Sequence, residues 1–215
     1  VACGNFQSPW EYHDTYSPTA RFSALRTITA IATQENLDLF AFDVEGAFMT
    51  SYLDTDVYMS LPPGYSLPPG KTIKLRKSLY GLKQSSNLYF ANITRWLHAY
   101  GFQEVSPDGC VFKLQRGEEK LILSLYVDDG VVATNSKKLY DKFMQDLGKE
   151  FKLSESSDLS WYLGVDFQRD RTRGNLTLSQ ERYIEQMLER FCMEDCNPSP
   201  TPAMRKAMAE AEVGD

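Results

Sequence analysis

Hydrophobic residues recur along the chain at two spacings, and the two spacings predict an interleaved series of helices and strands. Apolar residues at every third or fourth position, such as Phe22, Leu25 and Ile28, form one face of a helix. Ser and Pro residues mark predicted helix starts, with Pro18 in a first turn and Ser136 at an N-cap, and Gly101 marks an end. The predicted helices span residues 17–36, 89–100, 136–151 and 179–191, and residues 45–49 turn into a further short helix.

Short apolar or alternating runs predict the strands. They occupy residues 39–44, 58–61, 72–76 and 110–114, with hairpins over 121–134 and over 161–167 plus 174–178. A Pro- and Gly-rich loop interrupts the chain at residues 62–70. Strands and helices alternate irregularly and no repeat is visible, which favours an α+β fold with an antiparallel sheet packed on helices over a doubly wound parallel sheet.

Three aspartates stand among these apolar strands. Asp128 and Asp129 separate the two halves of the 121–134 hairpin, and Asp43 lies near the end of the 39–44 run. An Asp pair is also what a tight hairpin turn uses, so that interpretation stays open. Three carboxylates at one sheet edge repel one another and are costly to desolvate. Divalent cations offset that cost, and two ions roughly 3.5–4 Å apart suit in-line displacement at phosphorus.

Composition and charge narrow the class of protein. The 215 residues are 42% hydrophobic and 24% charged, as in globular domains, and the net charge is −6. The negative total argues against nucleic-acid binding by overall charge, so any such binding requires a local basic surface. The candidate residues fall close together in the sequence, and a solvated loop and helix face is the alternative: Lys71, Lys74, Arg76, Lys77, Lys83 and Arg95.

The four cysteines, Cys3, Cys110, Cys192 and Cys196, match the spacing of no zinc module. We interpret them as reduced, mostly packing cysteines of a reducing compartment. The apolar runs are too short for a transmembrane helix or a signal peptide, so no membrane partner is expected. The chain starts mid-pattern without Met, which indicates a fragment.

The Tyr-Val-Asp-Asp sequence at 126–129, between apolar strands, resembles the palm motif of reverse transcriptases. Further blocks resemble copia-type retrotransposon polymerases in order and spacing, so that the resemblance covers nearly the whole chain. These blocks are residues 42–48, 57–64, 74–85, 162–164, 178–180 and 191–196, with Thr201 and Pro202.

The resemblance implies a right-hand polymerase that copies RNA into DNA. It assigns residues 1–38 to truncated fingers, 39–58 to the palm, 59–85 to the fingers, 86–166 to the palm, and 167–215 to the start of a thumb or connection. It also implies two Mg²⁺ ions, with Mn²⁺ as a substitute. One would lower the pKa of the primer 3′-hydroxyl, and the other would hold the incoming triphosphate and stabilise the leaving pyrophosphate.

Site roles follow from the same resemblance. Asp43 and Asp128 would be the principal ligands of both metals, Asp129 a third, and Val44 a further metal-site residue. Phe48, five residues after Asp43, would exclude a ribose 2′-hydroxyl as a steric gate. On the sequence alone, an ordinary core Phe is the better interpretation of Phe48.

Other positions would contact the substrates. Gln84 and Ala47 would meet the incoming nucleotide, although a surface position at a helix start is the alternative for Gln84. Lys83 and Arg76 would meet phosphates, or else lie in solvent. The primer terminus would rest on Tyr126 and Val127, which also suit a plain strand, and on a primer grip at Tyr162, Leu163 and Gly164, which also suit a hairpin turn.

The pattern departs from the family at Cys3, where the family carries an Arg that helps hold the triphosphate. A charge-assisted contact of this kind contributes about 1.5–3 kcal/mol. Two other interpretations therefore stand beside the enzyme: a catalytically decayed retroelement remnant, and a non-catalytic module that binds a hybrid duplex.

The implied partners are an RNA or DNA template-primer, deoxynucleoside triphosphates, and the remaining integrase and ribonuclease H parts of a Pol polyprotein. A homodimer is compatible with the resemblance. The implied location is a cytoplasmic virus-like particle, followed by the nucleus.

Overall fold

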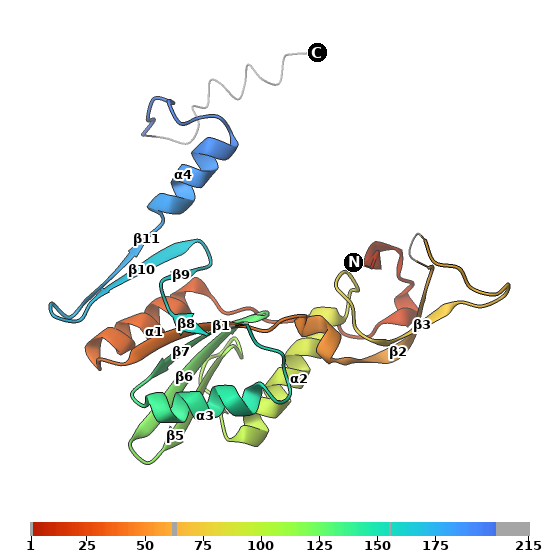
Figure 1. The fold of residues 1–215 in the computed structure, drawn as a ribbon, viewed down its shortest axis with the longest axis horizontal. Coiled ribbons are helices and arrows are strands. Elements are labelled where there is room, and N and C mark those ends of the chain that lie inside the picture. The colour runs from red at the N-terminus through yellow and green to blue at the C-terminus, as the bar shows by residue number, and fades with distance from the viewer. Residues whose placement is uncertain (1, 62–63, 155, 201–215) are drawn as a thin grey trace.

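A six-stranded antiparallel sheet forms the centre of the molecule (Figure 1), in a computed structural model that describes residues 2–61, 64–154 and 156–200. Its strand order is β4-β5-β6-β7-β1-β8. The strands are β4 (Gln103–Glu104), β5 (Val111–Arg116), β6 (Glu119–Tyr126), β7 (Asp129–Thr134), β1 (Asp38–Asp43) and β8 (Ser157–Asp158). The antiparallel α+β prediction is confirmed. Predicted features at Pro62, Pro63, Thr201 and Pro202 lie outside the described residues.

Helices cover both faces of this sheet. Helices α2 (Ser85–Tyr100) and α3 (Lys137–Leu147) share one hydrophobic core with Phe40 and Phe42 of β1. Helix α1 (Phe22–Gln34) packs on the opposite face with Leu39. Successive strand residues point to opposite faces, so β1 serves both cores and is buried on both sides.

Local signals set most helix ends. The Ser136 side chain accepts a hydrogen bond from the Leu139 N–H and caps α3, and Gly101 ends α2 with a φ of 111°. Helix α1 begins at Phe22, so the predicted start at residues 17–19 is wrong. The Asn87 side chain donates to the Tyr16 carbonyl, and this tertiary contact holds the preceding segment against α2.

Strands β2 (Tyr52–Met59) and β3 (Ile73–Lys77) pair as a ribbon that projects from the sheet together with the N-terminal segment (Figure 1). That segment contains the short 3-10 helices η1 (Gly4–Phe6) and η2 (Pro9–Glu11), and η3 (Ala47–Thr50) lies before the ribbon. The predicted strand at 58–61 starts too late, because half of the β2 residues are exposed and its hydrophobic alternation is weak.

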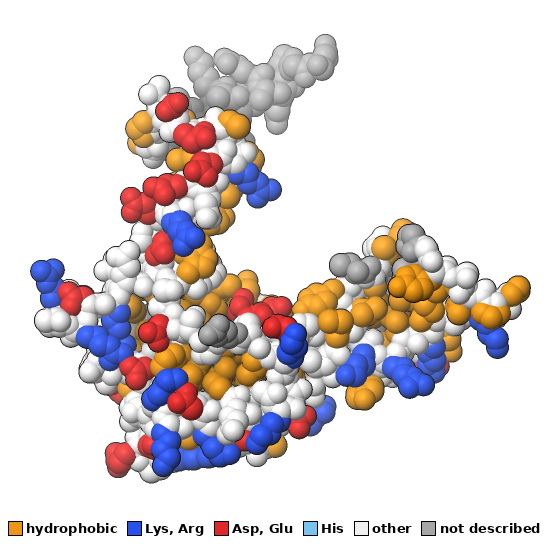
Figure 2. All heavy atoms as spheres, in the orientation of Figure 1, with side chains coloured by type: hydrophobic (Ala, Val, Ile, Leu, Met, Phe, Trp, Pro, Cys, Tyr) orange, Lys and Arg blue, Asp and Glu red, His pale blue; other side chains and the backbone are white. Residues whose placement is uncertain are grey.

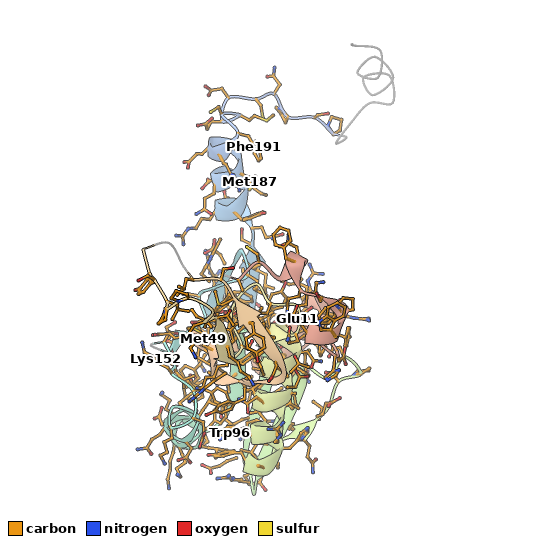
Figure 3. All side chains as sticks on the ribbon, turned by 90° about the vertical axis from the view of Figure 1, so that its right-hand side faces the viewer. Glu11, Met49, Trp96, Lys152, Met187 and Phe191 are labelled. Atoms are coloured by element: carbon orange, nitrogen blue, oxygen red, sulfur yellow. The ribbon has the colours of Figure 1, made fainter. Side chains whose placement is uncertain are left out.

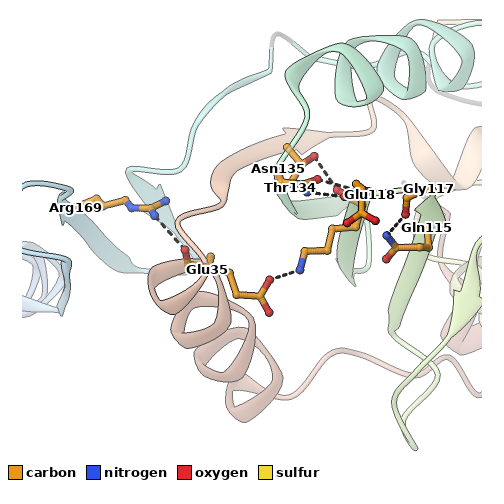
Figure 4. Close-up of polar contacts among 9 residues, drawn as sticks. Glu35, Gln115, Gly117, Glu118, Thr134, Asn135 and Arg169 are labelled. Atoms are coloured by element: carbon orange, nitrogen blue, oxygen red, sulfur yellow. Dashed lines mark hydrogen bonds and ion pairs between the residues drawn. The ribbon is translucent and has the colours of Figure 1, made fainter.

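A second sheet of three strands contains β9 (Trp161–Tyr162), β10 (Val165–Asp170) and β11 (Asn175–Ser179). The predicted single strand over 161–167 is wrong, because Leu163 and Gly164 have φ values of 49° and 76° and turn the chain back on itself. Arg169 of β10 donates to the carbonyls of Leu37 and Ala32, which fixes this sheet at the C-terminal end of α1. Figure 4 shows Arg169 reaching toward the end of that helix.

Helix α4 (Glu181–Arg190) extends outward from the three-stranded sheet (Figure 1). Its first turn contacts that sheet, with Arg182 over the Trp161 ring of β9. Met187 and Phe191 lie farther along the helix, toward its C-terminal end (Figure 3). Its N-cap is Gln180 rather than the predicted Ser179, although Ser179 Oγ still accepts a hydrogen bond from the Glu181 N–H.

All four cysteines are free, as predicted. The expectation that they are mostly packing residues is wrong, since only Cys110 is buried. Within the described residues, none of the helices has both the length and the apolar character needed to cross a membrane.

Candidate active site

The hairpin of β6 and β7 places two of the three aspartates. Tyr126 pairs with Asp129 across the hairpin, so the loop contains only Val127 and Asp128. Val127 has a φ of 57°, which is uncommon for a β-branched residue and matches the loop position where such hairpins usually carry Gly. The sharp turn leaves the Asp128 side chain at the end of the sheet rather than within it.

Strand β1 brings the third aspartate to the same end. Asp43 and Asp129 are register partners across β1 and β7, although 86 positions separate them in the sequence (129 − 43 = 86). The Val44 N–H donates to the Asp128 carbonyl at 2.9 Å, which joins the loop to the end of β1. The structure therefore brings together the three aspartates that the sequence singles out.

The segment after α3 holds the main chain of Asp43 in place. The Asp43 N–H donates to Ser154 Oγ at 3.1 Å, and the Ser154 N–H donates to the Asp43 carbonyl at 2.9 Å. The Glu45 N–H donates to the Lys152 carbonyl at 2.8 Å. These bonds fix the main chain around Asp43 without using its carboxylate.

Asp128 lies close enough to Asp43 and Asp129 to influence their protonation. Burial, followed by the charges of Asp128 and Asp43, raises the pKa of Asp129 to about 6. Burial, followed by the charges of Asp128 and Glu45, also raises the pKa of Asp43. Both shifts have the same cause, because partial desolvation and neighbouring negative charge disfavour the ionised form of a carboxyl group.

The donor set suits a hard divalent cation, which prefers carboxylate oxygen and would remove this repulsion. Asp43, Asp128 and Asp129 supply such oxygens. The side chain of Val44 is apolar and buried, so only its main-chain carbonyl oxygen could serve as a metal ligand. Among the described residues, however, no group of three or more His, Cys, Asp or Glu side chains is arranged so that it could hold a metal ion.

Phe48 lies in η3, beside the aspartates. Its ring contacts those of Tyr80, at a centroid distance of 4.6 Å, and Tyr89, at 6.1 Å. The side chain is half-buried, and it is therefore neither a fully enclosed core residue nor a free surface residue. Ala47, its predicted companion at the nucleotide, is completely buried.

Gln84 is completely buried, so the alternative of a surface residue at the helix start is wrong for it. Its amide nitrogen donates to the Glu11 carbonyl at 2.9 Å, and its amide oxygen accepts from Gln7 at 3.1 Å. Lys83 is likewise engaged, because its ammonium donates to the Gln7 carbonyl and lies over the Tyr12 ring. The N-terminal segment therefore forms hydrogen bonds with Gln84 and Lys83, the two side chains that the sequence suggests for substrate contacts.

Three of the predicted primer-contacting residues meet around one cavity of about 390 Å³. Tyr126, Tyr162 and Leu163 all line it, opposite α1 residues such as Phe22. Tyr162 is buried, whereas Leu163 is 40% exposed at the turn that also contains Gly164. Both earlier interpretations of 162–164 therefore remain compatible, since the grip candidate is itself a turn between β9 and β10.

Arg76 is exposed on β3, away from the aspartates. Lys and Arg side chains lie along the β2–β3 projection (Figure 2). Some of this charge is already balanced, since Lys74 forms an ion pair with Asp56 at 2.6 Å. Of the six predicted basic residues, three lie on β3 and Lys71 precedes it, whereas Arg95 lies on α2 and Lys83 just before that helix. The predicted basic residues are therefore divided between the ribbon and α2.

Two tyrosines near the aspartates were missed by the sequence reasoning. Negative charge on Asp128 and Asp43, after burial, raises the pKa values of both Tyr80 and Tyr89. Tyr89 is 1% exposed and its hydroxyl has no hydrogen-bond partner among the described residues. Tyr80 lies within the 74–85 block, so its place in that block was the available signal.

Comparison with known proteins agrees with this arrangement. Residues 1–205 match the family described as "Reverse transcriptase (RNA-dependent DNA polymerase)". The chain is 34% identical over 195 residues to the "Retrovirus-related Pol polyprotein from transposon TNT 1-94" of Nicotiana tabacum, with 89% of the chain covered. It is 34% identical over 205 residues to the transposon RE1 polyprotein of Arabidopsis thaliana, with 94% covered.

A more distant relative is the "Transposon Ty1-BL Gag-Pol polyprotein" of Saccharomyces cerevisiae, which is 30% identical over 227 residues. The chain spans only a small part of each relative: 15% of the tobacco protein, 14% of the Arabidopsis protein and 12% of the yeast protein.

Proposed function

Because the chain belongs to the reverse transcriptase (RNA-dependent DNA polymerase) family, as a copia-type domain of a transposon Pol polyprotein, we propose that it extends a primer by nucleotidyl transfer on an RNA template. The single observation that carries the proposal is the pairing of Asp43 with Asp129 beside the Asp128 loop. Turn aspartates alone would not require a third carboxylate from a strand 86 positions away.

Asp43 and Asp128 would hold two Mg²⁺ ions, with Asp129 as the less central ligand. Bound there, the ions would acidify the primer 3′-hydroxyl and stabilise the leaving pyrophosphate. The chain's own part is to keep the carboxylates together: the Val44 N–H fixes the loop, and Ser154 fixes the main chain of Asp43.

The remaining site residues would place the substrates. Phe48 would lie under the sugar of the incoming nucleotide, next to the buried Ala47. Tyr126, Val127 and the 162–164 turn would support the primer end. Gln84 and Lys83 could reach a nucleotide only if the Gln7 and Glu11 contacts opened, so their proposed roles depend on movement of the N-terminal segment.

The fold supports a right-hand arrangement. We assign the six-stranded sheet with α2 and α3 to the palm, the β2–β3 ribbon and the N-terminal segment to the fingers, and α4 to the start of the thumb. Helix α1 packs on the sheet, which favours the palm for residues 22–38 over the fingers suggested by sequence.

Primer extension tests the proposal. The purified chain should add deoxynucleotides to a DNA primer on an RNA template in Mg²⁺. Asp128→Asn should lower the rate at least roughly 100-fold, because several kcal/mol of charge stabilisation are lost. Asp141→Asn is the matched control, since Asp141 lies on the exposed side of α3 and its ion pair among the described residues is with Lys137 at 2.6 Å.

Undiminished extension by the Asp128 variant would refute the ligand assignment. A wild-type protein that binds the hybrid duplex but incorporates no nucleotide would instead support a decayed remnant or a binding module. The Cys3 position, exposed beside the fingers segment, is the feature that favours those alternatives.

A further inference from the structure

Tyr80 occupies a turn whose backbone is held from three sides. The Ser78 N–H donates to the Ser51 carbonyl at 2.9 Å, and Ser85 Oγ of α2 donates to the Leu79 carbonyl at 2.5 Å. The Ala2 N–H of the N-terminal segment donates to the carbonyl of Tyr80 itself at 2.7 Å. These hydrogen bonds fix the backbone of the turn, and the Tyr80 side chain extends from it toward the aspartates.

The side chain of Tyr80 lies against residues of the candidate active site. Its ring packs on Phe48 at 4.6 Å, with an interplanar angle of 41°. Burial, followed by the charges of Asp128 and Asp43, raises the pKa of its hydroxyl, so that the hydroxyl lies near these carboxylates. One residue thus contacts the proposed sugar-contacting ring and faces a proposed metal ligand.

We propose that Tyr80 is a positioning residue of the nucleotide site, whose ring sets the place of Phe48 and whose hydroxyl donates a hydrogen bond to the Asp128 carboxylate. The inference rests on the proposed polymerase function. It assigns the two halves of one side chain to different tasks: the ring to discrimination between sugars, and the hydroxyl to orientation of the carboxylate.

The ring acts through packing. Phe48 contacts the rings of both Tyr80 and Tyr89, and Tyr89 is fixed within α2. Removing the Tyr80 ring would take away the nearer of these two contacts, so that Phe48 could move away from a ribose 2′-hydroxyl. The expected effect is on nucleotide choice.

The hydroxyl acts through Asp128. A neutral donor to a carboxylate limits its rotation and forms a charge-assisted bond. Removing the donor should therefore weaken cation binding while the ring still supports Phe48. The two effects are separable by two substitutions at a single position.

The experiment compares Tyr80→Ala and Tyr80→Phe with a control, Tyr140→Phe. Tyr140 is buried, whereas Tyr80 is half-buried, and the Tyr140 hydroxyl is engaged with Ser156 while its ring packs on Phe40. The measurements are kcat/KM for deoxy- against ribonucleotides, and the Mg²⁺ concentration that gives half of the thermal stabilisation. The second measurement needs no catalysis.

Tyr80→Ala should reduce discrimination against ribonucleotides about tenfold, the scale of a changed apolar contact in a pocket. Tyr80→Phe should keep discrimination but raise the Mg²⁺ midpoint about tenfold, as for a lost hydrogen bond to a charged group. Tyr140→Phe should lower stability while changing neither readout. A purely structural role for Tyr80 would predict the Tyr140 pattern for both of its variants.

Unchanged discrimination in Tyr80→Ala overturns the inference while leaving the polymerase function intact. A wild-type chain that extends no primer contradicts the proposed function instead, and the Mg²⁺ titration then decides the inference. A Tyr80→Phe midpoint equal to that of the wild type overturns it, and a wild type without any Mg²⁺ effect overturns both.

Discussion

At the scale of one residue, Asp129 lowers the stability of the folded protein in exchange for a carboxylate at the candidate active site. Its carboxylate is half-buried beside Asp128 and Asp43, and its pKa is raised to about 6 from an ordinary value near 3.8. An acid whose pKa is raised by folding destabilises the folded protein once it ionises. The penalty is absent below the unfolded pKa, grows as the pH rises through the folded pKa, and is fully present above it.

We predict that Asp129→Asn stabilises the metal-free protein by about 1–2 kcal/mol at pH 7.5, after allowance for solvent screening. Near pH 4 the gain should be close to zero, because Asp129 is then protonated in the folded protein. Urea unfolding in EDTA at the two pH values measures this. Asp141→Asn is the control, and a loss of stability in Asp129→Asn at pH 7.5 would contradict the interpretation.

The sequence predicts the aspartates well and the polar substrate contacts less well, for a physical reason. A carboxylate at the edge of an apolar run is unusual in itself, so Asp43, Asp128 and Asp129 stand out without any structure. Gln84 does not, because its burial depends on Gln7 and Glu11, which are 77 and 73 positions away. Contacts of that range leave no local pattern.

At the scale of elements, the pairing of β1 with β7 depends on one glycine. Gly130 faces Phe42 across the two strands, one residue from Asp129 and Asp43. A Cβ at Gly130 would fall well inside contact distance of the Phe42 ring. The absence of a side chain therefore allows the two aspartate-bearing strands to lie together.

Gly130→Ala should destabilise the protein by about 1–3 kcal/mol, as overpacking does. It should also lower primer extension, because the strands that carry Asp43 and Asp129 must separate. Gly148→Ala adds the same methyl group at the end of α3, where the nearest atom is a carbonyl oxygen 3.2 Å away. That control should change stability far less, and equal losses from the two substitutions would argue against a special role for Gly130.

Elements with strong local signals were predicted and those set by tertiary contacts were not. The Ser136 cap and Gly101 terminator act within a few residues, and the structure has both. The start of α1 and the split of residues 161–167 depend on contacts of Tyr16 with Asn87 and on positive φ at Leu163, a residue that rarely adopts it. Neither is visible in hydrophobic spacing.

At the scale of the whole molecule, Arg169 connects the second sheet to the first. It donates to the Ala32 carbonyl at 3.0 Å and to Asn36 Oδ1 at 3.2 Å, and it also reaches the Leu37 carbonyl just before β1. A cation at the C-terminal end of a helix is favoured by the carbonyls exposed there. The contact joins α1, β1 and β10 at one point (Figure 4).

Arg169→Ala should cost about 1.5–3 kcal/mol, the range for hydrogen bonds of charged groups. Amide hydrogen exchange should accelerate in β9, β10 and β11 while β5 and β6 remain protected. Arg173→Ala is the control, because the Arg173 side chain is 80% exposed and pairs only locally with Asp170. Uniform acceleration across both sheets would show that Arg169 does not act as a local connection.

The arrangement of the parts was the least predictable aspect. Spacing predicts α4 as a helix with an apolar stripe, yet Ile184 and Phe191 are 56% and 61% exposed. Amphipathic spacing shows which face of a helix is apolar and says nothing about where its partner lies. The β2–β3 ribbon was difficult to predict for a similar reason, because it depends on pairing between residues such as Val57 and Leu75 that are distant in the sequence.

The central claim is that Asp43 and Asp128 together hold the catalytic cations, and the position of the ions tests it most directly. The measurement is anomalous diffraction from crystals of the chain with Mn²⁺, a primer-template and a non-hydrolysable deoxynucleotide. We expect two peaks, each about 2–2.4 Å from oxygens of both aspartates, with Asp129 nearby. Peaks only at other carboxylates, or Asp43 without a peak while the nucleotide is bound, would contradict the account.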